Sequence, residues 1–94
     1  MRVSKHSNHA NIAGALSGSL RSGDVENLDF MAPAATYNAV KALALAAEFI
    51  KPQGIKPVIE VKSFKTPVGK HEEEKTVYRF VVHPVPIAEE NDDE

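Results

Sequence analysis

Lys5 and His6 stand directly before the first stretch of helical periodicity, where basic side chains can bind an anion. The first N–H groups of a helix lack partners and the helix dipole is positive there, so this position favours a phosphate. Lys5 would add a neutralising charge. A solvated helix start, capped by Ser7, Asn8 or Asn11, is the alternative explanation of the same residues.

Asn38 and Lys41 lie three residues apart in a second helical stretch, so they share one face. Lys41 is the only charge within residues 39–47, which are otherwise almost wholly apolar. The pair predicts a contact to a base or a phosphate. The alternative is a lysine whose stem covers apolar surface while its charge reaches water at a helix or dimer edge.

A third basic group decorates a predicted C-terminal hairpin, where Lys65, Lys70 and Arg79 are accompanied by Lys62, His71 and Lys75. A basic arm of this kind can straddle a duplex and contact its phosphates. Interleaved glutamates at position 60 and positions 72–74 cancel much of this field. A charged hairpin that resists edge-to-edge aggregation is therefore the alternative.

The chain lacks the residue sets of common catalytic and metal sites. It has no cysteine, which excludes disulfides, thiolate ligands and cysteine nucleophiles. His6 and His9 are close in sequence but have no converging third ligand. Neither a nucleophile elbow nor a phosphate-binding loop is present. We therefore expect no enzyme, no metal and no cofactor.

Length and charge place the chain among small single domains. It has 94 residues and a formal net charge of −2, but five of its 13 acidic residues lie in the last six positions, while all 11 Lys and Arg precede them. The body is therefore mildly basic, with a net charge of +3. The lack of cysteines, of a spanning apolar segment and of a signal peptide predicts a cytoplasmic protein without a membrane partner.

Hydrophobic periodicity predicts the elements that position these residues. Helices are expected over about 9–22 and 34–51, and strands over 2–5, 25–31, 55–65 and 72–83, with a loop at 66–71. The order β-α-β-α-β-β predicts a two-layer α+β fold, with two helices on one face of a mixed four-stranded sheet. We assign the domain to residues 1–84 and an acidic, disordered tail to 85–94.

The second predicted helix is apolar on nearly all sides, which indicates burial on more than one face. In a chain this small, one face can meet the sheet and another a partner subunit. Its Val40, Leu43, Ala44 and Ala47 are the residues that we expect in a homodimer or higher homo-oligomer.

Several short motifs resemble the stage V sporulation protein S family. They are Val3-Ser4, Ile12-Ala13-Gly14-Ala15-Leu16, Leu20-Arg21, Asn38-Ala39-Val40-Lys41-Ala42, and Phe49 with Pro52 and Gly54. The resemblance covers roughly residues 2–84. It implies a fold similar to the Alba superfamily, a dimeric or larger assembly without catalytic activity, and regulation of sporulation and septation. Alba-like proteins bind nucleic acid with basic residues near the first helix and on the last hairpin.

These observations lead to two functional hypotheses. The first is a regulatory protein that contacts the backbone of DNA or RNA with low sequence specificity, through Lys5, His6, Asn38, Lys41, Lys65, Lys70 and Arg79. The second is a protein–protein assembly module that binds no nucleic acid. Their responses to salt separate them, because phosphate-driven binding weakens with ionic strength whereas apolar assembly does not.

Overall fold

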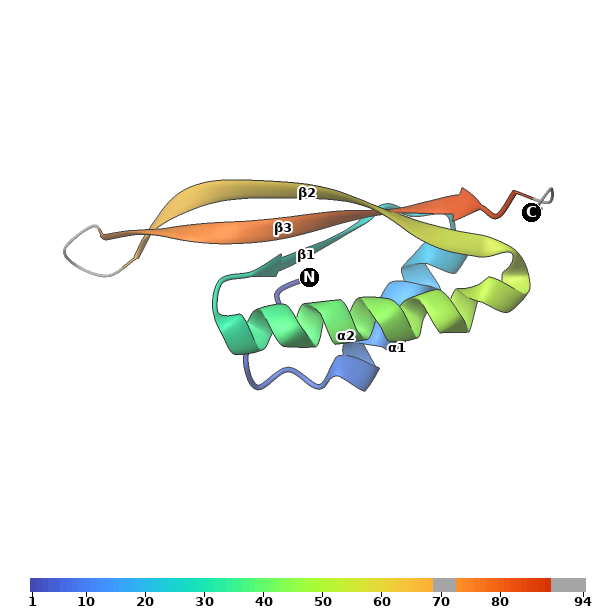
Figure 1. The fold of residues 1–94 in the computed structure, drawn as a ribbon, viewed down its shortest axis with the longest axis horizontal. Coiled ribbons are helices and arrows are strands. Elements are labelled where there is room, and N and C mark those ends of the chain that lie inside the picture. The colour runs from blue at the N-terminus through green and yellow to red at the C-terminus, as the bar shows by residue number, and fades with distance from the viewer. Residues whose placement is uncertain (69–72, 89–94) are drawn as a thin grey trace.

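The computed structural model describes residues 1–68 and 73–88 and shows two helices and a three-stranded antiparallel sheet (Figure 1). The elements in chain order are α1 (His9–Arg21), β1 (Glu26–Phe30), α2 (Pro33–Ile50), the 3-10 helix η1 (Lys51–Gln53), β2 (Ile55–Val68) and β3 (Glu73–Pro86). The predicted α+β class and both helices are confirmed. Both helices lie on the same side of the sheet (Figure 1).

The predicted first strand at residues 2–5 is not a strand but a single parallel bridge between Arg2 and Asp29. The Val3 amide donates to the Asp29 carbonyl at 2.8 Å, and the Asp29 amide donates to the Met1 carbonyl at 2.9 Å. The pairing ends there because the Ser4 amide donates instead to the Ser7 hydroxyl. The described strands therefore run in the order β1-β3-β2, all antiparallel, and the predicted mixed four-stranded sheet is not confirmed.

Helix α1 starts and packs as its sequence predicts. The Asn8 side chain accepts hydrogen bonds from the amides of Ala10 and Asn11, which satisfies two N–H groups that no helix carbonyl can reach. Leu16 and Leu20, four residues apart, are fully buried between the sheet and α2. After Arg21 the chain turns at Gly23, whose φ of 85° suits glycine.

Helix α2 buries a row of small residues at Ala35, Ala39, Ala42 and Ala46. Short side chains let this helix lie close to α1, so the two helices form one layer. Leu28 and Val82 complete the core from the sheet side. Phe30 joins them, packing edge-on against Phe80 with ring centroids 4.8 Å apart.

Strands β2 and β3 form a long hairpin that extends past the body of the domain (Figure 1). Residues 55–68 pair with residues 73–86 throughout, whereas β1 pairs only with residues 78–82. The outer part of the hairpin, which we call the hairpin arm (residues 64–68 and 73–77), therefore has no third strand beside it among the residues that the structure describes. It replaces the first half of the loop predicted at 66–71, because residues 66–68 belong to β2; residues 69–71 of that loop lie outside the described residues.

The strand β3 continues two residues past the predicted domain boundary. Val85 pairs with Lys56 and Pro86 with Ile55, and the Ile87 amide donates to the Gly54 carbonyl at 2.9 Å. The start of the segment assigned to a disordered tail is therefore part of the sheet. Its acidic end, residues 89–94, lies outside the described residues.

Candidate nucleic-acid interface

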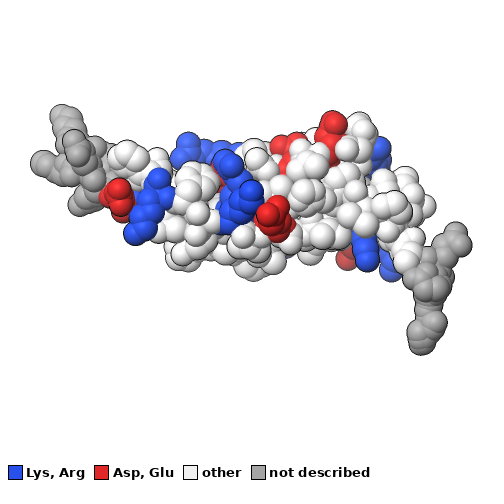
Figure 2. Space-filling model, turned by 90° about the horizontal axis from the view of Figure 1, so that it is seen from above, with Lys and Arg blue, Asp and Glu red and all other residues white. Residues whose placement is uncertain are grey.

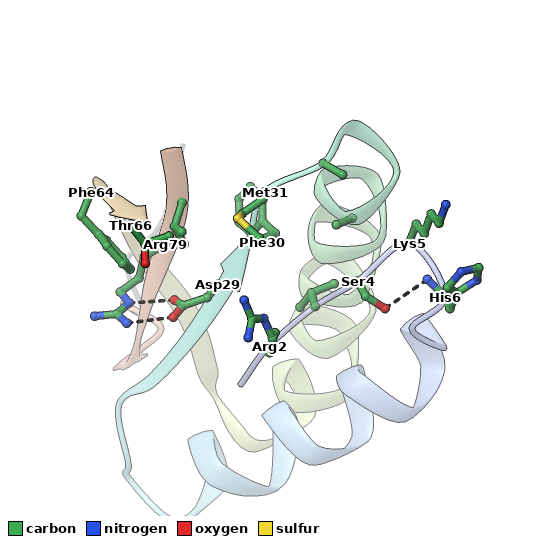
Figure 3. Close-up of a pocket in the computed structure, with 14 residues that line it drawn as sticks. Arg2, Ser4, Lys5, His6, Asp29, Phe30, Met31, Phe64, Thr66 and Arg79 are labelled. Carbon is green, nitrogen blue, oxygen red and sulfur yellow. Dashed lines mark hydrogen bonds and ion pairs between the residues drawn. The ribbon is translucent and has the colours of Figure 1, made fainter. Parts of the chain in front are cut away.

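A cavity of about 650 Å³ lies between the N-terminal segment, the end of β1 and the hairpin arm (Figure 3). Its apolar floor contains Phe30, Met31 and Val77. Its lining also includes the charged or ionisable side chains of Arg2, Lys5, His6, Asp29 and Arg79. The cavity thus brings together residues that are far apart in the sequence. Within the part of the chain that the structure describes, its permanently charged lining groups are three cations and one carboxylate.

A hydrogen-bonded turn, residues 4–7, presents Lys5 and His6 at one rim of this cavity. The Ser7 amide donates to the Ser4 carbonyl at 3.2 Å, and the His6 amide donates to the Ser4 hydroxyl at 3.1 Å. The Lys5 and His6 side chains are exposed and point outward, away from the hairpin (Figure 3). The two basic groups are therefore accessible to a ligand.

The Asn38 side chain fastens this turn to α2. Its Nδ2 lies within hydrogen-bond distance of three backbone carbonyls, those of Ser4 at 3.1 Å and of Lys5 and Ser7 at 3.3 Å. The amide donors that we assigned to a base or phosphate are thus directed at the protein. Asn38 acts as a positioning residue for the turn that carries Lys5 and His6.

Arg79 and Asp29 form a two-pronged ion pair at the opposite rim (Figure 3). Arg79 Nε donates to Asp29 Oδ1 at 2.7 Å, and a terminal guanidinium nitrogen donates to Oδ2 at 2.8 Å. The hydrogen bonds from Arg79 lower the pKa of Asp29 below its ordinary value, against the opposing effect of partial burial. The same bonds raise the pKa of Arg79. Arg79 keeps three other N–H groups for a ligand.

The Asp29–Arg79 pair gives a testable pH dependence of stability. Because the folded pKa of Asp29 lies below its unfolded value, the pair contributes its full stability above about pH 4. That contribution is lost as the pH falls through the folded pKa. We expect Asp29→Asn to be less stable than wild type at neutral pH, with the difference shrinking on acidification. Urea denaturation across the pH range measures this, and a difference that does not change with pH would contradict it.

The other predicted contact residues are distributed over the surface. Lys41 is exposed on α2, with its ammonium 5.6 Å from the centre of the Tyr37 ring. Lys65 precedes Thr66, which lines the cavity, so Lys65 points to the opposite face of β2. Lys70 lies outside the described residues. The structure therefore gathers Lys5, His6 and Arg79 around one cavity, and it does not place Lys41 or Lys65 in its lining.

The residues predicted for a dimer interface lie partly in the core and partly at the surface. Leu43 packs against the core, and Ala47 is half-buried. Val40 is 51% exposed and Ala44 is also exposed, so the outer face of α2 does carry an uncovered apolar strip.

Sequence reasoning missed Arg2, Met31 and Phe64 as parts of the site. Alternation along β2 contained a signal for Phe64, because Ile59 and Val61 face the helices and residues 60, 62 and 64 face outward. An aromatic ring on a face otherwise occupied by Glu60 and Lys62 is unusual. No comparable signal existed for Met31, which reaches the cavity only through the tertiary fold.

The outer face of the sheet carries charges of both signs (Figure 2). Lys and Arg gather mainly over the half that leads into the hairpin arm, with Asp and Glu between them (Figure 2). Lys62, Arg79 and Asp29 form one row across the three strands. On this face, positive charge is therefore denser towards the hairpin arm, although Lys and Arg also lie at the opposite end (Figure 2).

Within residues 1–68 and 73–88, no helix has the length and apolar character needed to cross a membrane. A family model for stage V sporulation protein S matches residues 1–85, which confirms the resemblance inferred from the sequence motifs. The match spans all the helices and nearly all of the sheet described above. It supports a role related to sporulation, and the chain belongs to the stage V sporulation protein S family.

Proposed function

We propose that this chain is a regulatory protein that binds DNA or RNA, mainly through contacts to the phosphate backbone. The observation that carries the proposal is that Arg2, Lys5, His6 and Arg79 all line one cavity, with the exposed Lys5 and His6 side chains pointing outward from its rim. Cations on a preformed surface bind phosphates at little ordering cost, and they are insensitive to base sequence. Low specificity follows, since the site offers few side chains suited to reading base edges.

Asn38 supports this function indirectly. Without restraint by Asn38, the turn that carries Lys5 and His6 would adopt many conformations, and ordering it on binding would cost conformational entropy and lower the affinity. The three contacts from the Asn38 amide restrict the turn before a ligand arrives. Lys41 and Lys65 do not line this cavity, so any contact that they make to the same strand would be peripheral.

The biological setting that we propose is regulation of sporulation by a non-catalytic cytoplasmic protein. Family membership supports the link to sporulation. We also propose that the chain regulates cell division and binds nucleic acid in an Alba-like manner. Both proposals rest on the resemblance of the sequence motifs described above.

Salt-dependent binding tests the proposal. Fluorescence anisotropy with labelled single-stranded RNA and with duplex DNA is expected to show binding at low salt that weakens steeply towards physiological salt, through counterion release. Failure of the full chain to bind either probe at low salt would overturn the proposal.

A second candidate is an assembly module without nucleic-acid binding, and the exposed apolar strip on α2 favours it. Tyr37 is 63% exposed beside Val40, and Val61 on the helix-facing side of β2 is 66% exposed. β2 is also an edge strand of the described sheet, so its outer backbone groups are open to pairing. We propose a second copy of the chain as the partner of this surface; a homodimer or larger homo-oligomer would be compatible with either function.

The assembly candidate has its own test. Val40→Glu places a charge in the apolar strip and is expected to shift the chain to monomer in sedimentation measurements, because the charge would have to be buried in the assembly. Ala10→Glu, on the exposed side of α1, is the matched control. Wild-type chain that is already monomeric at high concentration would contradict this candidate.

A further inference from the structure

The cavity combines three surfaces that differ in chemistry. Its floor is apolar, its wall at β2 is the aromatic ring of Phe64, and its rim includes Arg2 together with Lys5 and His6, whose side chains point outward from the rim (Figure 3). Among the described residues, Asp29 is the only acidic side chain that lines the cavity, and Arg79 donates to both of its oxygens. A ligand that suits this arrangement has a flat apolar part and a negatively charged part.

The position of Phe64 is the strongest single observation. The ring lies on the outer face of β2 and is 40% exposed, although burial of so large an apolar group would be favourable. The Arg79 guanidinium carbon lies 5.0 Å from the ring centre and fixes the ring beside the ion pair. An aromatic ring with an adjacent guanidinium is a surface on which nucleic-acid bases stack.

The size and shape of the cavity agree with such a ligand. Its volume of about 650 Å³ lies within the usual range for pockets that take small organic ligands. Met31 is partly exposed, and its sulfur points into the space between the hairpin and the N-terminal segment (Figure 3). A base in this space would contact Met31 and Phe64, while its phosphates would reach Arg2 or Lys5.

We propose that the cavity binds one unpaired nucleotide of a single strand, with the base against Phe64 and Met31 and the flanking phosphates at the basic rim. This inference rests on the proposed nucleic-acid-binding function and names the form of nucleic acid that the site takes. In a duplex, both faces of each base are covered by neighbouring bases, so only an unpaired base can enter the cavity.

Substitution of Phe64 tests the inference. Single-stranded oligoadenylate of about 12 nucleotides and a duplex of the same length serve as labelled probes. We expect Phe64→Ala to lower the affinity for the single strand by about fivefold to tenfold, because a stacking partner is lost. Duplex affinity should change less than about twofold, because duplex binding uses the phosphates alone. Phe64→Tyr keeps the ring and should retain single-strand affinity.

Val58→Ala is the matched control, since Val58 lies on the same strand and the same outer face, and is 42% exposed. It should leave both affinities unchanged, and thermal unfolding verifies that each variant is folded. If wild type binds the single strand and Phe64→Ala binds it with the same affinity, the inference is overturned while the proposed function stands. A chain that binds neither probe would overturn the proposed function itself.

A free mononucleotide shares the chemistry of this ligand and is a separate arm of the experiment. Adenosine monophosphate has one phosphate and cannot reach the basic rim on both sides of the base, so we expect it to compete with the strand only weakly. If adenosine monophosphate displaces the labelled strand at concentrations similar to those at which unlabelled strand does, the ligand would be a free mononucleotide, and the proposal of a single strand would be overturned.

Discussion

Reversing the charges of Arg2 and Lys5 together is expected to weaken single-strand binding by about a hundredfold at low salt. Each reversal removes a phosphate contact and adds a repulsive charge at the rim of the cavity. The dependence of affinity on salt should also become shallower, by about 0.7 in the log–log slope for each lost phosphate contact. Both side chains are exposed, so the fold should tolerate Arg2→Glu with Lys5→Glu.

A second double variant with the same net charge distinguishes a loss of local contacts at the cavity from a general effect of net charge on binding. Lys51 and Lys56 are exposed and belong to η1 and to the start of β2. The start of β2 lies at the end of the domain opposite the hairpin arm (Figure 1). Lys51→Glu with Lys56→Glu should reduce affinity much less than the reversal at the rim. Equal losses in the two double variants would mean that binding follows net charge, and would contradict a site at the cavity.

Removing the Asn38 side chain is expected to affect both stability and binding, although Asn38 does not face the ligand. Asn38→Ala loses the contacts to the carbonyls of Ser4, Lys5 and Ser7. We expect a loss of about 2 kcal/mol in the free energy of unfolding, since hydrogen bonds of this kind contribute roughly 1 kcal/mol each. Single-strand affinity should fall about tenfold, because binding must then order the free turn.

Hydrogen exchange distinguishes this positioning role from a direct contact. The Ser7 and His6 amides, which bond within the turn, should exchange faster in Asn38→Ala than in wild type. Asn11→Ala, at an exposed position on α1, is the control and should change neither exchange nor affinity. Weaker binding by Asn38→Ala without faster exchange would instead point to a direct contact between Asn38 and the strand.

Much of the fold could be predicted because its determinants are local. The four-residue spacing of Ile12, Leu16 and Leu20 sets the buried face of α1, and the cap at Asn8 fixes its start. The strand predicted at residues 2–5 was wrong, because Val3 suits a strand while the turn after it depends on Asn38, more than 30 residues away. Such a contact has no signature in local periodicity.

The site was predictable in its charges but not in its shape. Lys5 and His6 were identified from their place before α1, and Arg79 from the basic hairpin. Identifying Asp29 as the ion-pair partner of Arg79 required the strand register, because the register places Asp29 directly opposite Arg79. The cavity itself arises where the hairpin arm passes the N-terminal segment, so the roles of Met31 and Phe64 follow only from the tertiary structure.

The most direct test of the account is a nuclear magnetic resonance titration of the labelled full chain with a single strand of about 12 nucleotides at low salt. We predict that amide shifts concentrate at residues 2–6, at Phe64 and Thr66, and at residues 77–79, which surround the cavity. Shifts that instead follow the exposed strip of α2 around Val40 and Ala44 would contradict the account and place the interaction on the assembly surface.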